Sequence, residues 1–278
     1  MGTARLTTAP RREPFDIGRP LGIGFILTAM LPLVMLPLAS IFIYSLKEGP
    51  THFWQALMNP VALFSLRLTL LTSSVTTACN VLFGLLAAYV MSKYRFRGES
   101  ALMILISLPT AIPTAVAGFA LLLLWGRKGL IGQFLEQTDF QVMFTTAAII
   151  LANVFVTFPL AFGVIKPALD NLDTSLEDAA ATLGASRWQA FRFVILPSLR
   201  GAIITGALLT FARSIGEFGS TIMVSGNLAM KTQTAPLYIY AKFNDGDVEG
   251  ANAIAAVLAI ISIIVFSLIL LTRKKLER

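Results

Sequence analysis

Charged residues are scarce in this sequence. Only 13% of its 278 residues are charged, whereas 56% are hydrophobic, and the mean hydropathy is +0.76. A soluble domain usually has about a quarter charged residues and about 45–50% apolar residues. This chain has too much apolar surface to bury in one water-soluble core, so its composition predicts a membrane protein.

Cysteine and histidine are almost absent, and a nucleotide-binding loop is missing. The only cysteine is Cys79 and the only histidine is His52, which excludes an intramolecular disulfide and predicts no metal site. No segment reads Gly-x-x-x-x-Gly-Lys-Ser/Thr, the loop that cradles nucleotide phosphates. We therefore expect no cofactor on this chain and no binding of ATP by that mechanism.

Six segments are long and apolar enough to cross a bilayer, which takes about 20 residues of helix. The sequence therefore predicts an all-α polytopic membrane protein with its transmembrane domain at residues 21–272. Residues 1–20 and 273–278 are expected to form tails, and the first of these lacks the apolar stretch of a signal peptide. The six predicted spans are 21–45, 66–91, 101–125, 144–165, 201–224 and 251–272.

The basic residues favour one orientation. With the N-terminus inside the cell, fifteen Lys and Arg residues fall in inner segments and five in outer segments. Such an excess marks the cytoplasmic side of a membrane protein. We therefore predict that both termini are cytoplasmic. The same distribution accounts for the net charge of +7 without nucleic acid as a partner.

The longest inner loop, residues 166–200, contains helix signals of its own. Thr174 or Ser175 can cap a helix whose first turn carries acidic residues. Gly184 can end this helix, and Ser186 can cap a second one that runs to Pro197. We predict a helix–glycine–helix element at residues 174–197, outside the membrane.

This element also carries a family resemblance. Asp178-Ala179-Ala180, then three residues, Gly184, nine residues and Val194-Ile195-Leu196-Pro197 resemble the coupling loop of type I ABC importer permeases. That family has Glu in place of Asp178 and Ile in place of Val194. An amphipathic surface helix would explain the same residues. The residues predicted to dock on an ATPase are Glu177, Asp178, Ala179, Ala180, Gly184, Arg187, Leu196 and Pro197.

The resemblance implies a non-catalytic subunit of a larger assembly in the inner or plasma membrane of a bacterial-type cell. Its partners would be a dimer of ABC ATPase subunits holding ATP and Mg²⁺, a second permease subunit, identical or paralogous, and an extracytoplasmic anion-binding protein. Docking also has a physical basis. Small residues at Ala179, Ala180 and Gly184 permit close approach, and Arg187 and Arg192 can steer the loop toward an acidic rim.

Four further stretches resemble the sulfate and molybdate branch of these permeases. They are residues 108–118, 211–219, 225–227 and 231–237. The resemblance implies import of a tetrahedral oxyanion, and it favours sulfate or thiosulfate over molybdate or tungstate. The residues themselves leave the choice among these anions open.

Two prolines interrupt the third predicted span. Pro109 and Pro113 each remove a backbone donor, and a helix broken at membrane depth lines protein or a water-filled cavity. The half-helix ends, together with the hydroxyls of Thr110 and Thr114, would suit an anion pathway. A packing kink explains the same prolines.

An ion pair is expected within the fifth predicted span. Arg213 and Glu217 lie four residues apart and so share one helix face, and ionisable groups at this depth usually face the bundle interior and pair. The pair is either a gate or pathway element or a structural pair that fixes helix packing. Gly216 and Gly219 are expected to let a neighbouring helix approach closely.

The remaining polar residues within the spans are few. Asn80 and Asn153 are expected to make interhelical hydrogen bonds, and His52 and Cys79 receive no role. An ion-driven secondary transporter would show inverted repeats and several intramembrane acids, whereas Glu217 is the one such acid in the predicted spans. A non-transporting assembly or signalling protein of the membrane is a third alternative.

Overall fold

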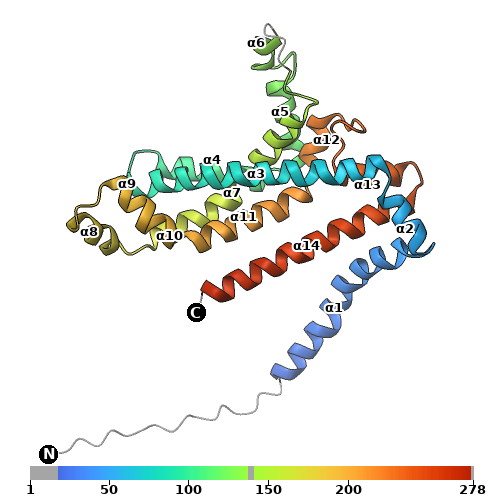
Figure 1. The fold of residues 1–278 in the computed structure, drawn as a ribbon, viewed down its shortest axis with the longest axis horizontal. Coiled ribbons are helices and arrows are strands. Elements are labelled where there is room, and N and C mark those ends of the chain that lie inside the picture. The colour runs from blue at the N-terminus through green and yellow to red at the C-terminus, as the bar shows by residue number, and fades with distance from the viewer. Residues whose placement is uncertain (1–17, 137–140, 277–278) are drawn as a thin grey trace, which may run out of the picture.

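The computed structural model describes residues 18–136 and 141–276, and every regular element in these two ranges is a helix. The long helices run roughly along one axis, and shorter ones lie at its ends or project from its side (Figure 1). The elements are α1 (Gly18–Ser45), α2 (Pro50–Leu57), α3 (Pro60–Lys93), α4 (Glu99–Ala111), α5 (Thr114–Trp125), α6 (Gly132–Glu136), α7 (Thr146–Asp170), α8 (Ser175–Thr182), α9 (Arg187–Ala190), the π-helix η1 (Phe191–Ile195), α10 (Leu196–Ser198), α11 (Arg200–Ile215), α12 (Gly219–Ser225), α13 (Ala235–Asn244) and α14 (Val248–Leu276).

Four of these helices are long and apolar enough to cross a membrane by themselves: α1, α3, α7 and α14. Two further spans are bent pairs, with α4 and α5 meeting at 112° and the segment from α9 to α10 meeting α11 at 64°. Counting each bent pair as one span gives the six that the sequence predicts. The fifth predicted span differs in detail, because its helix ends at Ile215 and a separate helix resumes at Gly219.

The two predicted tails are only partly described. Residues 1–17 and 277–278 lie outside the described ranges, so most of the predicted tail at 1–20 is not tested. At the other end, α14 continues to Leu276 and so enters the segment predicted as the 273–278 tail. The helix runs on because no glycine or proline follows Gly250 in the sequence to end it.

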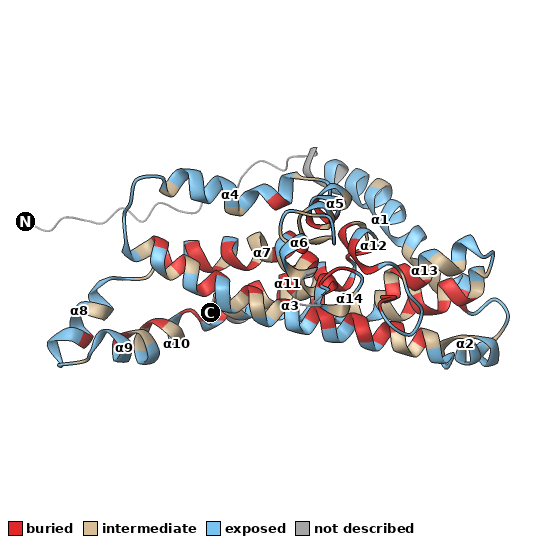
Figure 2. Ribbon diagram, turned by 90° about the horizontal axis from the view of Figure 1, so that it is seen from above, coloured by how far each residue is buried: buried red, intermediate tan, exposed pale blue. Residues whose placement is uncertain are grey.

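The core lies where α3, α7 and α11 pack side by side. Figure 2 shows buried residues concentrated on these helices, whereas α1 and α4 are mostly exposed. Small residues permit the close packing: a Cβ added at Gly84 of α3 or Gly206 of α11 would already be in contact with α7 at 3.4 Å. Such small-residue contacts are typical of helices that associate within a membrane.

The polar residues of the core are used in part to join helices. Asn80 of α3 donates from Nδ2 to Thr157 Oγ1 of α7 at 2.8 Å, and both residues are fully buried. This confirms the interhelical bond expected for Asn80. Asn153 is also buried, but its amide oxygen has no hydrogen-bond partner in the part of the chain that the structure describes, so the expectation for Asn153 is not confirmed.

Helix α1 stands apart from this core. Figure 1 shows it leaning away from α14 toward its N-terminal end, and none of its most apolar 18-residue window is buried. Two prolines, Pro32 and Pro37, lie inside it. An apolar helix without protein cover is stable in a bilayer because lipid chains are as apolar as its side chains.

Candidate functional site

The predicted helix–glycine–helix element forms at one end of the molecule, at the left of Figure 1. Helix α8 begins where Asp173 Oδ1 accepts a hydrogen bond from Ser175 N at 2.9 Å. This backbone hydrogen bond holds the pKa of Asp173 below its ordinary value. Thr174 occupies the N-cap position but makes no capping bond with its side chain. The start of the helix was predicted, but its capping side chain is the preceding aspartate.

Two residues shape the turn between α8 and α9. Gly184 has φ +82°, a conformation that residues with a Cβ rarely adopt. Ser186 then forms the predicted cap: its Oγ accepts from Gln189 N at 3.3 Å, and Gln189 Oε1 accepts from Ser186 N at 2.7 Å. This reciprocal pair is a capping box. Local residue chemistry is therefore sufficient to form this turn.

The second half of the element is not a regular α-helix. It passes through the π-helix Phe191–Ile195 before Pro197, and the chain then bends by 64° into α11. Aromatic rings stabilise this corner: Trp188 stacks on Phe191 with centroids 5.7 Å apart, and Tyr89 of α3 meets Phe191 edge-on at 5.0 Å. The loop is thereby held against the Lys93 end of α3.

The predicted docking residues do not all face outward. Ala180 is buried and packs inward, so the exposed small-residue surface consists of Ala179 and Gly184 without it. Leu196 is half-buried against the core of α3, α7 and α11. Glu177 is half-buried as well. The predicted residues that are exposed are Asp178, Ala179, Gly184, Arg187 and Pro197.

Three residues of this region were missed by the sequence analysis. Leu183 is 88% exposed at the tip of the loop, and Trp188 is 65% exposed. An apolar residue just before the helix-ending glycine was the available signal for Leu183. Lys93, the last residue of α3, forms an ion pair with Glu177. No sequence signal indicated this pair, because 84 residues separate its members.

The third predicted span is broken at Pro113 but not at Pro109, which lies inside α4. The backbone of Ile112 is extended between α4 and α5, and Pro113 caps α5. Thr110 is exposed, and its hydroxyl donates to Ser107 O at 2.7 Å. The two helices meet at 112°, and α5 and α6 project sideways from the long axis in Figure 1.

The predicted ion pair of the fifth span is present and bridges a second break. Arg213 Nη1 lies 2.7 Å from Glu217 Oε2. The other carboxylate oxygen of Glu217 accepts from Ser220 N at 2.8 Å and from Ser220 Oγ at 3.0 Å. Glu217 thus joins the end of α11 to the start of α12. Its side chain is 1% exposed, whereas that of Arg213 is 42% exposed.

The two breaks meet in space. A Cβ on Gly219 would collide with Thr114 Oγ1 of α5, and a Cβ on Gly118 would lie 2.5 Å from Ser220 O. The close approach predicted at Gly219 is confirmed. The prediction for Gly216 is wrong, since no atom of residues 18–136 or 141–276 lies within 4 Å of a Cβ placed there. The structure therefore joins two polar stretches that lie about a hundred residues apart in sequence.

The stretches 225–227 and 231–237 meet in one hydrogen-bonded loop between α12 and α13, here called the loop 225–235, and residues 235–237 form the first turn of α13. Thr232 Oγ1 donates to Ser225 O at 2.6 Å, and Gln233 Nε2 donates to Asn227 Oδ1 at 3.0 Å. Asn227 has a positive φ of 50°, as a tight turn requires. The loop is tied to α3 because Ala235 N donates to Thr69 Oγ1 at 2.7 Å.

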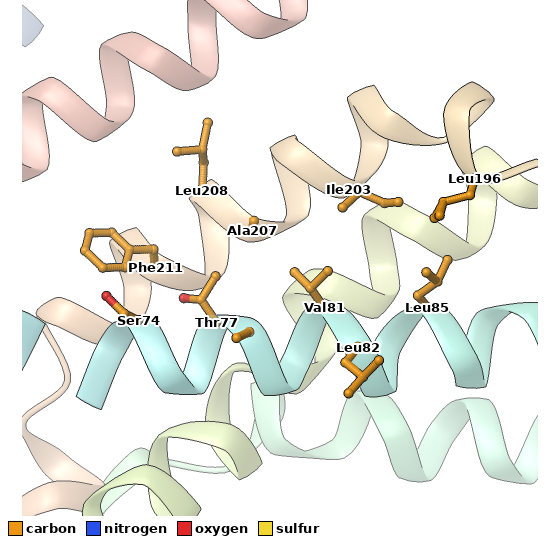
Figure 3. A pocket seen from close by; sticks show the side chains of 11 residues that line it. Ser74, Thr77, Val81, Leu82, Leu85, Leu196, Ile203, Ala207, Leu208 and Phe211 are labelled. Carbon is orange, nitrogen blue, oxygen red and sulfur yellow. The ribbon is translucent and has the colours of Figure 1, made fainter. Parts of the chain in front are cut away.

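A groove of about 590 Å³ runs between α3 and α11 (Figure 3). Leucine, valine, isoleucine, alanine and phenylalanine side chains line most of it. Its two hydroxyls are already engaged, since Ser74 donates to Leu70 O and Thr77 to Ser73 O, both at 2.7 Å. The groove offers an anion neither charge nor a free donor, so it is not the predicted pathway.

His52, to which the sequence assigned no role, has two acidic side chains near it. Its Nε2 lies 3.4 Å from Glu48 Oε2, and one ligand atom of each of His52, Glu48 and Glu249 lies within 4.8 Å of the others. The group is partly exposed to solvent, and exposed acidic groups often gather without an ion. It therefore does not define a metal site.

The fold and these sites define a polytopic helical membrane protein with a structured loop at one end and two broken helices in its side. The family described as “Binding-protein-dependent transport system inner membrane component” matches residues 80–276. The chain belongs to this family, and it is therefore a multi-pass protein of the inner membrane.

Relatives and solved structures agree with this family. The chain is 38% identical to “Sulfate transport system permease protein CysT” of Salmonella typhimurium, over 89% of both chains. It is 38% identical to “Sulfate transport system permease protein CysW” of Synechococcus elongatus, over 78% of this chain and 76% of that one. A bacterial alginate ABC transporter in complex with its periplasmic protein has the same fold, with a TM-score of 0.72, 17% identity, and coverage of 92% of this chain and 95% of that one.

Proposed function

We propose that this chain is the permease subunit of an ATP-driven importer for sulfate. The observation that carries the proposal is the 38% identity to a sulfate permease over 89% of both chains, because this likeness extends over most of the membrane domain of both proteins. The family membership supports an importer that works with a binding protein. The chain itself would perform no covalent chemistry.

We further propose that both termini and the loop 174–197 face the cytoplasm. The excess of basic residues on this side supports the orientation. In Figure 1 the start of α1 and the end of α14 are directed toward the end of the molecule where α8 and α9 lie. A single cytoplasmic face would therefore carry the tails and the loop.

The loop 174–197 is proposed to dock in a groove of an ABC ATPase subunit. Its exposed surface combines small residues at Ala179 and Gly184 with a protruding apolar side chain, Leu183. Arg187 is exposed beside them and can meet an acidic rim. ATP and Mg²⁺ would be held by two such ATPase subunits, and their closure would move the docked loop.

A second permease subunit is proposed to complete the pathway. The extended backbone near Ile112 and the exposed Thr110, Ala111 and Pro113 lie within a span, where irregular backbone is tolerated only against protein or water. A neighbouring subunit or the aqueous pathway would therefore cover this break. An identical copy and a paralogue both satisfy this requirement.

The two breaks are the proposed pathway or gate. Glu217 is buried and engages one terminal nitrogen of Arg213, whose side chain remains 42% exposed. A guanidinium has five N–H donors, so Arg213 retains donors for a dianion while Glu217 holds its position. Thr114 adds a hydroxyl beside the same junction. Pro113 stands at the first break and opposes a continuous helix there, and Pro109 lies one turn earlier, inside α4.

The proposal is tested by reconstituting the permease with its ATPase, second permease and binding protein in lipid vesicles. Sulfate uptake that requires ATP is expected, with weaker uptake of molybdate. Uptake driven by a proton gradient without ATP would support a secondary transporter instead. Uptake of molybdate in preference to sulfate would overturn the assignment of the anion while leaving the importer class intact.

A further inference from the structure

The covalent route from the docking loop into the membrane is interrupted repeatedly. It passes through the π-helix Phe191–Ile195, the 64° bend at Leu199 and the break between Ile215 and Gly219. Non-α turns and breaks of this kind are the places where helices bend. A displacement of the loop would therefore be absorbed in part before it reached α12.

Helix α3 offers a continuous route instead. It runs for 34 residues from Pro60 to Lys93, and its only proline is at the first position, so its length is about 50 Å at 1.5 Å per residue. Its buried threonine hydroxyls find partners within the helix: Thr69 donates to Ser65 O at 2.8 Å, and Thr72 donates to Leu68 O at 2.9 Å. Along this length no break separates its two ends.

The inner end of α3 is attached to the docking loop. Lys93 pairs with Glu177 in the first turn of α8, and the two side chains are 29% and 25% exposed. Partial shielding from solvent makes such a pair stronger than a fully exposed one. One turn earlier, Tyr89 packs edge-on against Phe191 at 5.0 Å. Ser92 also donates to Asp170, at the end of α7, at 2.6 Å.

The outer part of α3 is attached to the loop that follows α12. Thr69 is 2% exposed and accepts from Ala235 N at 2.7 Å. Close to it, Ala62 and Leu66 pack against Tyr238 of α13 in one buried cluster. The same rigid helix therefore contacts the loop 174–197 at one end and the loop 225–235 at the other.

We propose that α3 is a second mechanical link between the docking loop and the outer loop 225–235, and that Lys93 and Glu177 are the positioning residues that attach it. Glu177 then does not contact the ATPase; it connects α8 to the end of α3 through its ion pair with Lys93. The inference rests on the proposed function, since it assumes that an ATPase moves the loop 174–197. It adds a route for that movement which does not follow the chain.

The test uses charge reversal in the complete reconstituted complex. Lys93→Glu and Glu177→Lys alone place like charges together, whereas the double variant restores an opposite pair. Each single variant is expected to keep its ATPase on purification but to lower sulfate imported per ATP by about five- to tenfold, within the usual range of coupling between sites. The double variant is expected to recover at least half of the loss, and Lys93→Arg should behave as wild type. Arg97→Glu, an equal charge change at an exposed residue of the same inner loop, is the matched control and should have no effect.

A second readout does not depend on the anion. A fluorescent label at Leu228→Cys in a Cys79→Ala background would report on the exposed tip of the loop 225–235. ATP is expected to shift its emission in the wild-type complex and in the double variant, and much less in either single variant. Equal label shifts in all variants would overturn the link. Loss of the ATPase from a single variant would also overturn it, because the residue would then belong to the docking surface. If the wild-type complex imports no sulfate but the label responses differ as expected, the proposed anion fails and the link stands.

Discussion

Replacing Gly118 by alanine tests the meeting of the two broken helices. The added Cβ would lie 2.5 Å from Ser220 O and 2.6 Å from Ser220 Cα. Both are backbone atoms of α12, so no side chain can rotate away, and α5 and α12 would have to separate. Overpacking of this kind costs about 1–3 kcal/mol. For a chain of this size the corresponding loss in Tm is about 2–12 °C.

The assay is thermal unfolding of the purified complex, followed by sulfate uptake in vesicles. Gly163→Ala is the matched control, because Gly163 lies in α7 and nothing is within 4 Å of its added Cβ. Its Tm should be unchanged or slightly higher, since alanine favours a helix over glycine. An unchanged Tm for Gly118→Ala would refute the contact between the breaks. Lowered Tm with full uptake would show that the contact is structural and not part of the gate.

Three further predictions concern separate parts of the molecule. Gly184→Val forces a β-branched residue to φ +82°, which costs about 1–2 kcal/mol. This variant should co-purify with less ATPase while its helix content is retained. An unchanged amount of ATPase would contradict the proposed docking role. Arg213→Ala leaves the carboxylate of Glu217 buried without its cation, so Tm should fall. The double variant Arg213→Ala/Glu217→Gln should regain the Tm of the wild type but not its sulfate uptake. Recovery of uptake in the double variant would show that the pair is purely structural. The hydrogen bond from Lys242 holds the pKa of Asp247 below its ordinary value of 3.8. The ionised carboxylate of Asp247 therefore contributes to stability at neutral pH, and this contribution disappears as pH falls through the lowered pKa. The Tm difference between wild type and Asp247→Asn should shrink between pH 7 and pH 3, and a constant difference would contradict this reasoning.

Much of the architecture could be predicted because a bilayer acts on each segment separately. Each spanning segment must satisfy its own backbone hydrogen bonds and be apolar over about 20 residues, so six spans are visible in the sequence without knowledge of their packing. The turn at Gly184 and the cap at Ser186 were also accessible, because residues only a few positions apart form them. The pairing of Arg213 with Glu217 has the same local origin.

Contacts between distant segments required the tertiary structure. The sequence indicated glycines that permit close packing, but it could not distinguish Gly219, which meets Thr114, from Gly216, which meets nothing within 4 Å. Nor could it show that the two helix breaks adjoin. Helix rotation and the choice of neighbour decide these contacts, and both depend on the packing of all spans together.

The loop 174–197 shows the same division most clearly. Its residue types and spacing determined that a helix–glycine–helix element would form, and they indicated its family. Only the folded chain decided which side chains face outward: Ala180 is buried, Leu183 protrudes, and Glu177 turns to Lys93 at the end of α3. The physical reason is that helix formation is governed by neighbours three or four residues away, whereas the orientation of a side chain depends on which distant helix lies beside it.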